Sequence, residues 1–110
     1  MIEIYTDGAA SGNPGPGGYG VILRAGQHYK ELSAGFRLTT NNRMELLAVI
    51  VGLNALKTAG QEVTVFSDSK YVIDSVEKKW VSGWVKTGFK GEKNKDLWMQ
   101  FLNICKQHHV

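Results

Sequence analysis

The stretch YTDGAASGNPGPGGYG, residues 5–20, decides the fold, because a strand there delivers an aspartate and passes directly into a loop of small residues. Ile2, Ile4 and Thr6 alternate with Glu3, Tyr5 and Asp7, and this period of two predicts the strand. A turn accounts for the glycines but not for Asp7 in front of them. The loop lacks the lysine and hydroxyl of a P-loop and does not match a dinucleotide-binding fingerprint. Asp7 is therefore a candidate functional residue whose partners lie elsewhere in the chain.

The hydrophobic pattern beyond this loop predicts further strands and helices. YGVILRAG (19–26) and HYKELSAGFRL (28–38) predict two strands joined by a tight turn. NNRMELLAVIVGLNALKTAG (41–60) is apolar on nearly every side, which is typical of a buried central helix, with Asn42 as its N-cap and Gly60 as its terminator. EVTVFSD (62–68) predicts a fourth strand, followed by helical segments from 69 to 79 and from 96 onward.

This order predicts one α/β domain over residues 1–110. The first three strands form an antiparallel meander, and the crossover helix carries the fourth strand parallel to the first. We expect a mixed sheet with helices packed on it.

Composition narrows the class of protein. The hydrophobic fraction of 43% and charged fraction of 21% are ordinary for a soluble domain. No apolar run has transmembrane length and no signal-peptide pattern precedes the first strand, so we expect no membrane contact. A single cysteine, Cys105, excludes an internal disulfide and favours a reducing, cytoplasmic location. Its place in an apolar helical stripe indicates a core thiol.

The positive charge is concentrated in one segment. The net charge is +3, but six lysines against one glutamate between Lys78 and Lys95 give that segment +5, and the remainder sums to −2. Such a segment favours a polyanionic partner. A solvated lysine-rich surface is the alternative.

Three acids are the strongest candidates for chemistry. Asp7 and Asp68 end strands that we expect to be parallel neighbours, and Glu45 lies in the first turn of the helix that packs over them. Each acid has a structural alternative: Asp7 as a turn residue, Glu45 as part of a capping box with Asn42, and Asp68 as a helix cap. All three expected positions nevertheless fall at one edge of the sheet.

Carboxylates gathered at one place repel each other unless a cation is present. Oxygen ligands of this kind suit Mg²⁺ or Mn²⁺. The histidines and the lone cysteine have no zinc-site spacing, and no serine or cysteine is placed as a nucleophile. Metal-assisted hydrolysis of a phosphodiester is the best-supported chemistry.

The chain resembles a type 1 ribonuclease H of the bacterial kind. The resemblance spans all 110 residues and rests on four motifs in order: YTDGAASGNPGPGGYG, TTNNRMEL (39–46), FSDSKYV (66–72) and the basic segment WVSGWVKTGFKGEKNKDLW (80–98). It implies a ribonuclease H-like fold. It also implies an endonuclease that cuts the RNA strand of RNA/DNA hybrids with two Mg²⁺ ions, leaving 5′-phosphate and 3′-hydroxyl ends.

The resemblance also assigns roles to residues. It implies that Asp7, Glu45 and Asp68 are catalytic metal ligands and that the Gly8 carbonyl lies near the metal. Alternatives stay open for some substrate contacts: Arg24 as a surface charge, Asn41 and Asn42 as capping residues, and one of the two tryptophans as core. The implied substrate contacts are Asn13, Arg24, Thr40, Asn41, Asn42, Trp80, Trp84, Lys86, Phe89 and Lys90.

Members of this family continue with a further strand, a histidine-bearing loop and a helix that supplies a fourth acid. His108 and His109 come too early for that loop. We expect the 110 residues to be a fragment of a longer, monomeric protein, or else a shortened form that is impaired. The competing hypotheses are a non-catalytic hybrid-binding module and a related metal nuclease or polynucleotidyl transferase acting on DNA.

Overall fold

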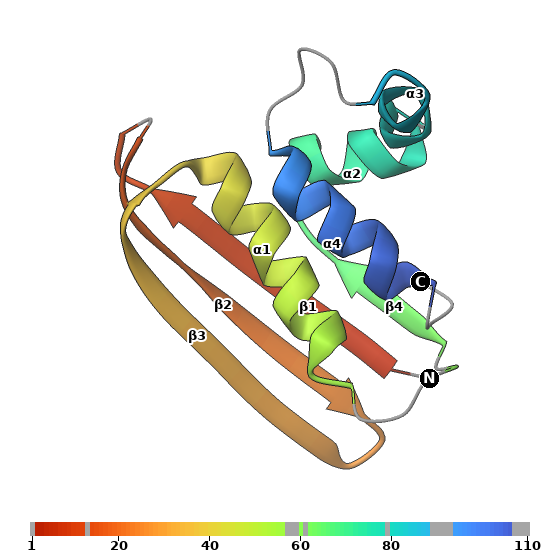
Figure 1. Cartoon of the computed structure of the whole chain (residues 1–110). Coiled ribbons are helices and arrows are strands. Elements are labelled where there is room, and N and C mark those ends of the chain that lie inside the picture. Colours follow the sequence, from red (N-terminus) through yellow and green to blue (C-terminus); the bar gives the residue numbers. More distant parts are fainter. Residues whose placement is uncertain are drawn as a thin grey trace.

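The computed structural model describes residues 2–12, 14–56, 60, 62–78, 80–88 and 94–106, and for residues 80–82 it describes the backbone alone. The elements in chain order are β1 (Ile2–Ala10), β2 (Gly15–Ala25), β3 (His28–Thr39), α1 (Asn41–Asn54), β4 (Val63–Phe66), α2 (Lys70–Glu77), α3 (Trp80–Lys86) and α4 (Lys95–Cys105) (Figure 1).

The sheet has the predicted mixed topology, with strand order β3-β2-β1-β4. β1, β2 and β3 form the antiparallel meander, and β4 pairs parallel to β1. The hairpin turn between β2 and β3 lies between Ala25 and His28, as expected, with Gly26 at φ +61°. These observations confirm the fold class.

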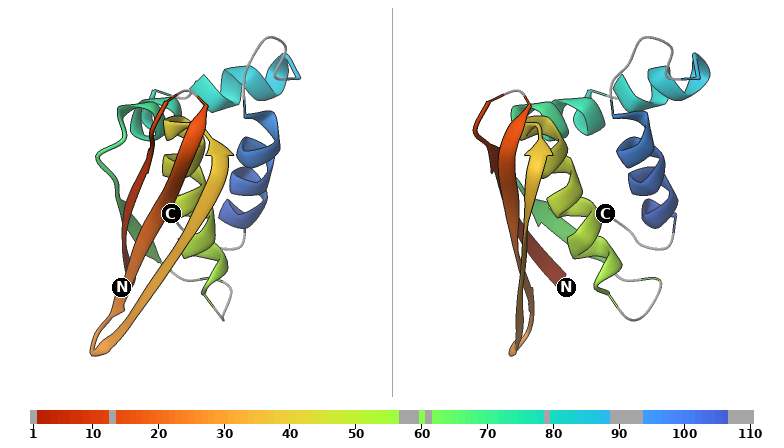
Figure 2. Two further views of the ribbon diagram at one scale, coloured as in Figure 1. Left: turned by 90° about the vertical axis from the view of Figure 1, so that its left-hand side faces the viewer. Right: turned by 60° about the vertical axis from the view of Figure 1, so that its left-hand side comes forward.

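The helices pack in a layer on one face of the sheet. Figure 2 shows α1 between the sheet and α4, with α2 and α3 gathered beyond one end of the strands. α1 is buried around much of its circumference because its two sides contact different layers, as its apolar sequence predicts. Gly52 permits the close approach to the sheet, since a Cβ there would lie 2.7 Å from Ile4 Cγ2 and 3.1 Å from Val21 Cγ1.

The core lies between β1, β2, α1 and α4. Trp98 of α4 is fully buried and makes an edge-to-face contact with Phe101, with ring centroids 5.5 Å apart. Cys105 is half-buried beside this cluster, and burial raises the pKa of its thiol to about 11. An inert core thiol is therefore the role that its surroundings favour. Among the described residues, no helix is both long enough and apolar enough to cross a membrane.

Two predicted helix boundaries are wrong. The N-cap of α1 is Thr40 and not Asn42: its Oγ1 accepts a hydrogen bond from the N–H of Arg43 at 3.2 Å. Thr40 directly follows β3 and still has an extended backbone, whereas Asn41 and Asn42 are already helical, so Thr40 is the residue that caps the helix. At the other end, α1 stops at Asn54 with Ala55 as its C-cap, so Gly60 is not its terminator.

Candidate active site

The three predicted acids converge at one edge of the sheet. Asp7, Glu45 and Asp68 each offer a carboxylate oxygen, and these oxygens all lie within 4.8 Å of one another. The parallel register explains why the two aspartates lie close together, because Tyr5 lies opposite Phe66 and each acid follows two residues later. Glu45 comes from the second turn of α1, not the first as expected, because the helix begins at Asn41, and α1 packs against β1. The sheet topology and one helix therefore bring together residues far apart in the chain.

Gly8 holds Glu45 in place through its backbone. Its N–H donates a hydrogen bond to Glu45 Oε1 at 3.1 Å, between buried groups. A Cβ at Gly8 would lie only 2.6 Å from the carbonyl carbon of Met44 and 2.8 Å from the N of Glu45. The glycine after Asp7 is required because β1 and the start of α1 touch backbone to backbone. This contact explains the glycine that directly follows the aspartate.

The surroundings of Glu45 disfavour the charged form of its carboxylate. The side chain is buried, and burial raises its pKa, as do the nearby charges of Asp68 and Asp7, while the Gly8 hydrogen bond acts in the opposite direction. Its Oε2 is buried and accepts no hydrogen bond from the described residues. A buried oxygen without a donor is costly in an apolar interior. A divalent cation would satisfy it, and the all-oxygen donor set suits Mg²⁺ or Mn²⁺.

The structural alternatives for the three acids are excluded by their contacts. Asp7 lies within β1 and not in a turn. The capping-box partner proposed for Glu45 is not the N-cap, and Glu45 bonds across to β1 instead. Ser69, not Asp68, caps α2, since its Oγ accepts from the N–H of Val72 at 3.2 Å. The ligand role predicted for the Gly8 carbonyl stays a prediction.

The polar residues at the start of α1 lie beside the acids. Thr40 caps the helix, and Asn41 Oδ1 accepts a hydrogen bond from the N–H of Ala10 at 3.1 Å, which joins α1 to the end of β1. Asn41 therefore has a structural role at the junction of β1 and α1. Asn42 is exposed in the first turn of α1. All three residues are within five positions of Glu45, so a substrate held at the acids would pass near them.

Arg24 lies away from this group. It is opposite Glu3 near the hairpin, four residues along β2 from Gly20, the partner of Asp7. That separation is roughly 13 Å along a strand. The structure does not bring Arg24 to the acids, and only a substrate extending along the sheet would contact both.

The basic segment is described in part. Trp84 is half-buried and makes an edge-to-face contact with Trp98, with ring centroids 5.9 Å apart, which confirms that one of the two tryptophans belongs partly to the core. Lys86 is exposed in the last turn of α3. The side chain of Trp80, and the residues Asn13, Phe89 and Lys90, lie outside the described part of the chain.

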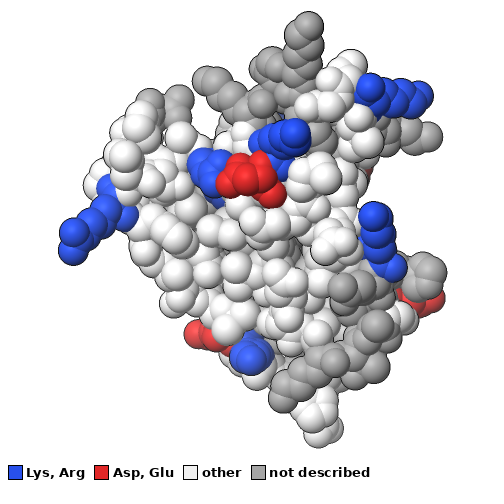
Figure 3. Space-filling model, viewed as in Figure 1, with Lys and Arg blue, Asp and Glu red and all other residues white. Residues whose placement is uncertain are grey.

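Sequence reasoning missed a group of polar residues that links the starts of α1, α2 and α4. Arg43 forms a bidentate ion pair with Asp96, and Asn94 and Tyr71 continue the network. Figure 3 shows acidic side chains between basic ones on this face, where α1 and α4 begin. Asn94, two residues before Asp96 and the apolar helical stripe, resembles an ordinary N-cap, so the sequence carries no signal for its actual contacts.

Comparison with known proteins agrees with the geometry. The RNase H family model matches residues 1–110. The chain is 55% identical to the Ribonuclease H of Syntrophus aciditrophicus (strain SB), covering 100% of this chain and 66% of that protein. It is 54% identical to the Ribonuclease H of Rippkaea orientalis, covering 99% of this chain and 69% of that protein. The 110 residues thus span about two thirds of the length of these relatives.

Solved structures of the same class share the fold. The N-terminal RNase H domain of rv2228c from Mycobacterium tuberculosis, solved as a fusion with maltose binding protein, matches with a TM-score of 0.77 at 29% identity, covering 98% of this chain and 76% of that one. LC11-RNase H1 in complex with an RNA/DNA hybrid matches with a TM-score of 0.66 at 27% identity, covering 99% and 79%. The chain belongs to the RNase H family.

Proposed function

We propose that this protein is an endonuclease that hydrolyses the RNA strand of RNA/DNA hybrids with two Mg²⁺ ions, leaving 5′-phosphate and 3′-hydroxyl ends. Family membership supports the reaction class. The observation that carries the proposal is Oε2 of Glu45, which is buried with no partner among the described residues, in a group of three acids that each offer an oxygen within 4.8 Å of the others. A purely structural role for these acids would leave Oε2 of Glu45 buried with no donor among the described residues.

Asp7, Glu45 and Asp68 would hold the cations, and Mn²⁺ could replace Mg²⁺ in the same oxygen donor set. When bound, such ions lower the pKa of an attacking water and offset charge on the leaving oxygen in an in-line displacement. The carboxylates act as ligands more than as proton carriers. Gly8 keeps Glu45 oriented for this role through its N–H.

The residues around the acids would bind the hybrid. Asn41 and Asn42 lie four and three residues before Glu45 and would contact the minor groove, where 2′-hydroxyls distinguish RNA from DNA. Thr40 would lie near a phosphate of the DNA strand. Lys86 and the exposed part of Trp84 would bind the DNA strand, with Arg24 reaching a more distant phosphate. Lysines read charge and aromatic faces accept any base, so we expect binding to be sequence-independent and salt-sensitive.

We infer that the protein acts as a monomer in the cytoplasm. The half-buried lone thiol of Cys105 fits a reducing compartment. The solved complex of LC11-RNase H1 with an RNA/DNA hybrid supports the proposed substrate.

A cleavage assay on labelled substrates tests the proposal. The wild type should cut the RNA strand of a hybrid in Mg²⁺, leave duplex DNA intact, and lose activity in EDTA or with Asp68→Asn. Cleavage of duplex DNA at a similar rate would replace the proposal with a DNA-directed nuclease. Hybrid binding without cleavage at any Mg²⁺ concentration would make the chain a hybrid-binding module.

A further inference from the structure

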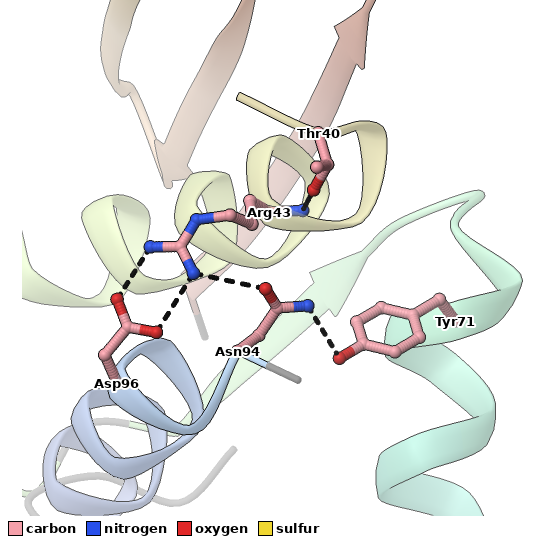
Figure 4. Close-up of polar contacts among 5 residues, drawn as sticks. All are labelled: Thr40, Arg43, Tyr71, Asn94 and Asp96. Atoms are coloured by element: carbon pink, nitrogen blue, oxygen red, sulfur yellow. Dashed lines mark hydrogen bonds and ion pairs between the residues drawn. The ribbon is translucent and has the colours of Figure 1, made fainter. Parts of the chain in front are cut away.

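A polar network joins the starts of α1, α2 and α4 (Figure 4). Arg43 donates to both oxygens of Asp96, from Nη1 to Oδ1 at 3.0 Å and from Nη2 to Oδ2 at 2.6 Å. Arg43 Nη1 also donates to Asn94 Oδ1 at 3.1 Å, and Asn94 Nδ2 donates to the hydroxyl of Tyr71 at 3.2 Å. The Arg43 side chain is 34% exposed and that of Asp96 58%, so the ion pair alone adds little stability.

The chemistry of the groups fixes the direction of these bonds. A guanidinium only donates, so Asn94 must turn its carbonyl oxygen toward Arg43 and its NH₂ toward Tyr71. The indole of Trp98 also only donates, and its Nε1 lies 2.8 Å from the same hydroxyl. The Tyr71 oxygen therefore accepts two hydrogen bonds. No other arrangement of the Asn94 amide satisfies both neighbours.

Asn94 adopts a backbone conformation that serves this bridge. It has φ +65° and is the sole non-glycine residue with positive φ in the described part of the chain. It occupies the N-cap position of α4 but makes no capping hydrogen bond with its side chain. An asparagine usually stabilises a helix from this position. Here the amide is directed instead into the gap between α1 and α2.

The bridge connects α1, which carries the buried Glu45, to α2, which begins just after Asp68. Arg43 is two residues before Glu45, and Tyr71 is three residues after Asp68. Asp7 is already tied to each of these neighbours, to Glu45 through Gly8 and to the Asp68 strand through the pairing of β1 with β4. Besides the direct packing of α1 against α2, a hydrogen-bonded path from α1, which carries Glu45, to α2, which follows Asp68, runs through Asn94.

We propose that Asn94 is a positioning residue for the proposed metal site, because its bridge from Arg43 to Tyr71 sets the distance between the Glu45 and Asp68 carboxylates. The inference rests on the proposed function only in taking these carboxylates as metal ligands. Asn94 contacts none of the three acids in the structure and acts through the placement of α1 and α2.

The test measures binding of Mn²⁺ alone, by electron paramagnetic resonance of the free ion, to the 110-residue chain and its variants. Asn94→Gly removes the amide but accepts the positive φ without strain. We expect it to weaken Mn²⁺ binding by no more than about 10-fold, the lower end of the loss for a group bonded directly to a metal ligand, because Asn94 acts one contact further away. Tyr71→Phe removes the accepting hydroxyl, keeps the ring beside Trp98, and should weaken binding in the same direction.

The matched control is Tyr29→Phe, which removes a hydroxyl bonded to Glu31 near the opposite end of the sheet. It should bind Mn²⁺ like the wild type. Wild-type affinity in a folded Tyr71→Phe or Asn94→Gly would overturn the inference, and Tyr71→Phe decides alone where Asn94→Gly does not fold. Failure of hybrid cleavage, with Mn²⁺ binding lost on Asp7→Asn and weakened on Asn94→Gly, would reject the proposed function and leave the inference standing.

Discussion

The N–H of Gly8 donates to Oε1 of Glu45 and leaves the other oxygen of that carboxylate buried without a partner among the described residues. A backbone N–H of β1 thereby holds one oxygen of a carboxylate that belongs to α1. The backbone contact between Gly8 and the start of α1 makes this possible.

Replacing Gly8 by alanine should therefore damage both stability and activity. The added Cβ would lie 2.6 Å from a backbone atom of Met44. Because the clash is with the backbone, rotation of a side chain cannot relieve it. We expect a loss of about 1–3 kcal/mol in the free energy of unfolding, typical of overpacking, measured by urea denaturation. Gly20→Ala is the matched control in the adjacent strand, because a Cβ there meets nothing within 4 Å. Equal stability of the two variants would contradict this account.

Asp7→Asn should abolish hybrid cleavage without unfolding the protein. Asp7 is exposed, and removing its charge relieves repulsion from Glu45 and Asp68, so the unfolding midpoint in EDTA should not fall. Added Mg²⁺ should raise the midpoint of the wild type more than that of the variant. Differential scanning calorimetry with and without Mg²⁺ checks this. Asp74→Asn in α2, which loses an ion pair with Lys78, serves as the control and should keep its activity. A wild-type rate in Asp7→Asn would remove Asp7 from the proposed site.

The raised pKa of Glu45 should make stability depend on pH when no metal is bound. Between the ordinary value of 4.5 and the raised one, the folded protein binds more protons than the unfolded chain. Stability therefore falls as the pH rises through this window. Urea denaturation in EDTA across pH 4–8 should show this slope in the wild type and a weaker one in Glu45→Gln. Parallel curves for the two proteins would mean that Glu45 titrates normally.

Lys86→Ala should weaken hybrid binding equally for all sequences. A lysine that contacts one phosphate contributes about one unit to the slope of log K against log salt, and the variant should lose that unit. Fluorescence anisotropy with a labelled hybrid over a range of salt concentrations measures the slope. Lys106→Ala, at the far end of α4, is the charge-matched control. An unchanged slope in Lys86→Ala would place the hybrid elsewhere on the surface.

Much of the architecture follows from local pattern. Alternation from Ile2 onward predicts β1, and the all-round apolar helix predicts the burial of α1. The parallel return of β4 follows from the crossover helix, and the convergence of Asp7 and Asp68 follows from the parallel register. These features depend on periodicity and chain connectivity, which the order of residues encodes directly.

By itself, then, the sequence determined the sheet order, the central helix and the three acids at one edge. Tertiary structure alone decided that Thr40 and not Asn42 caps α1, that Glu45 Oε2 has no partner in the described part of the chain, and that Asn94 bridges Arg43 to Tyr71. Those outcomes depend on how closely separate segments approach and which donors they bring. Packing sets the distances between residues far apart in the chain to within a few tenths of an ångström, and no local pattern of residue types records it.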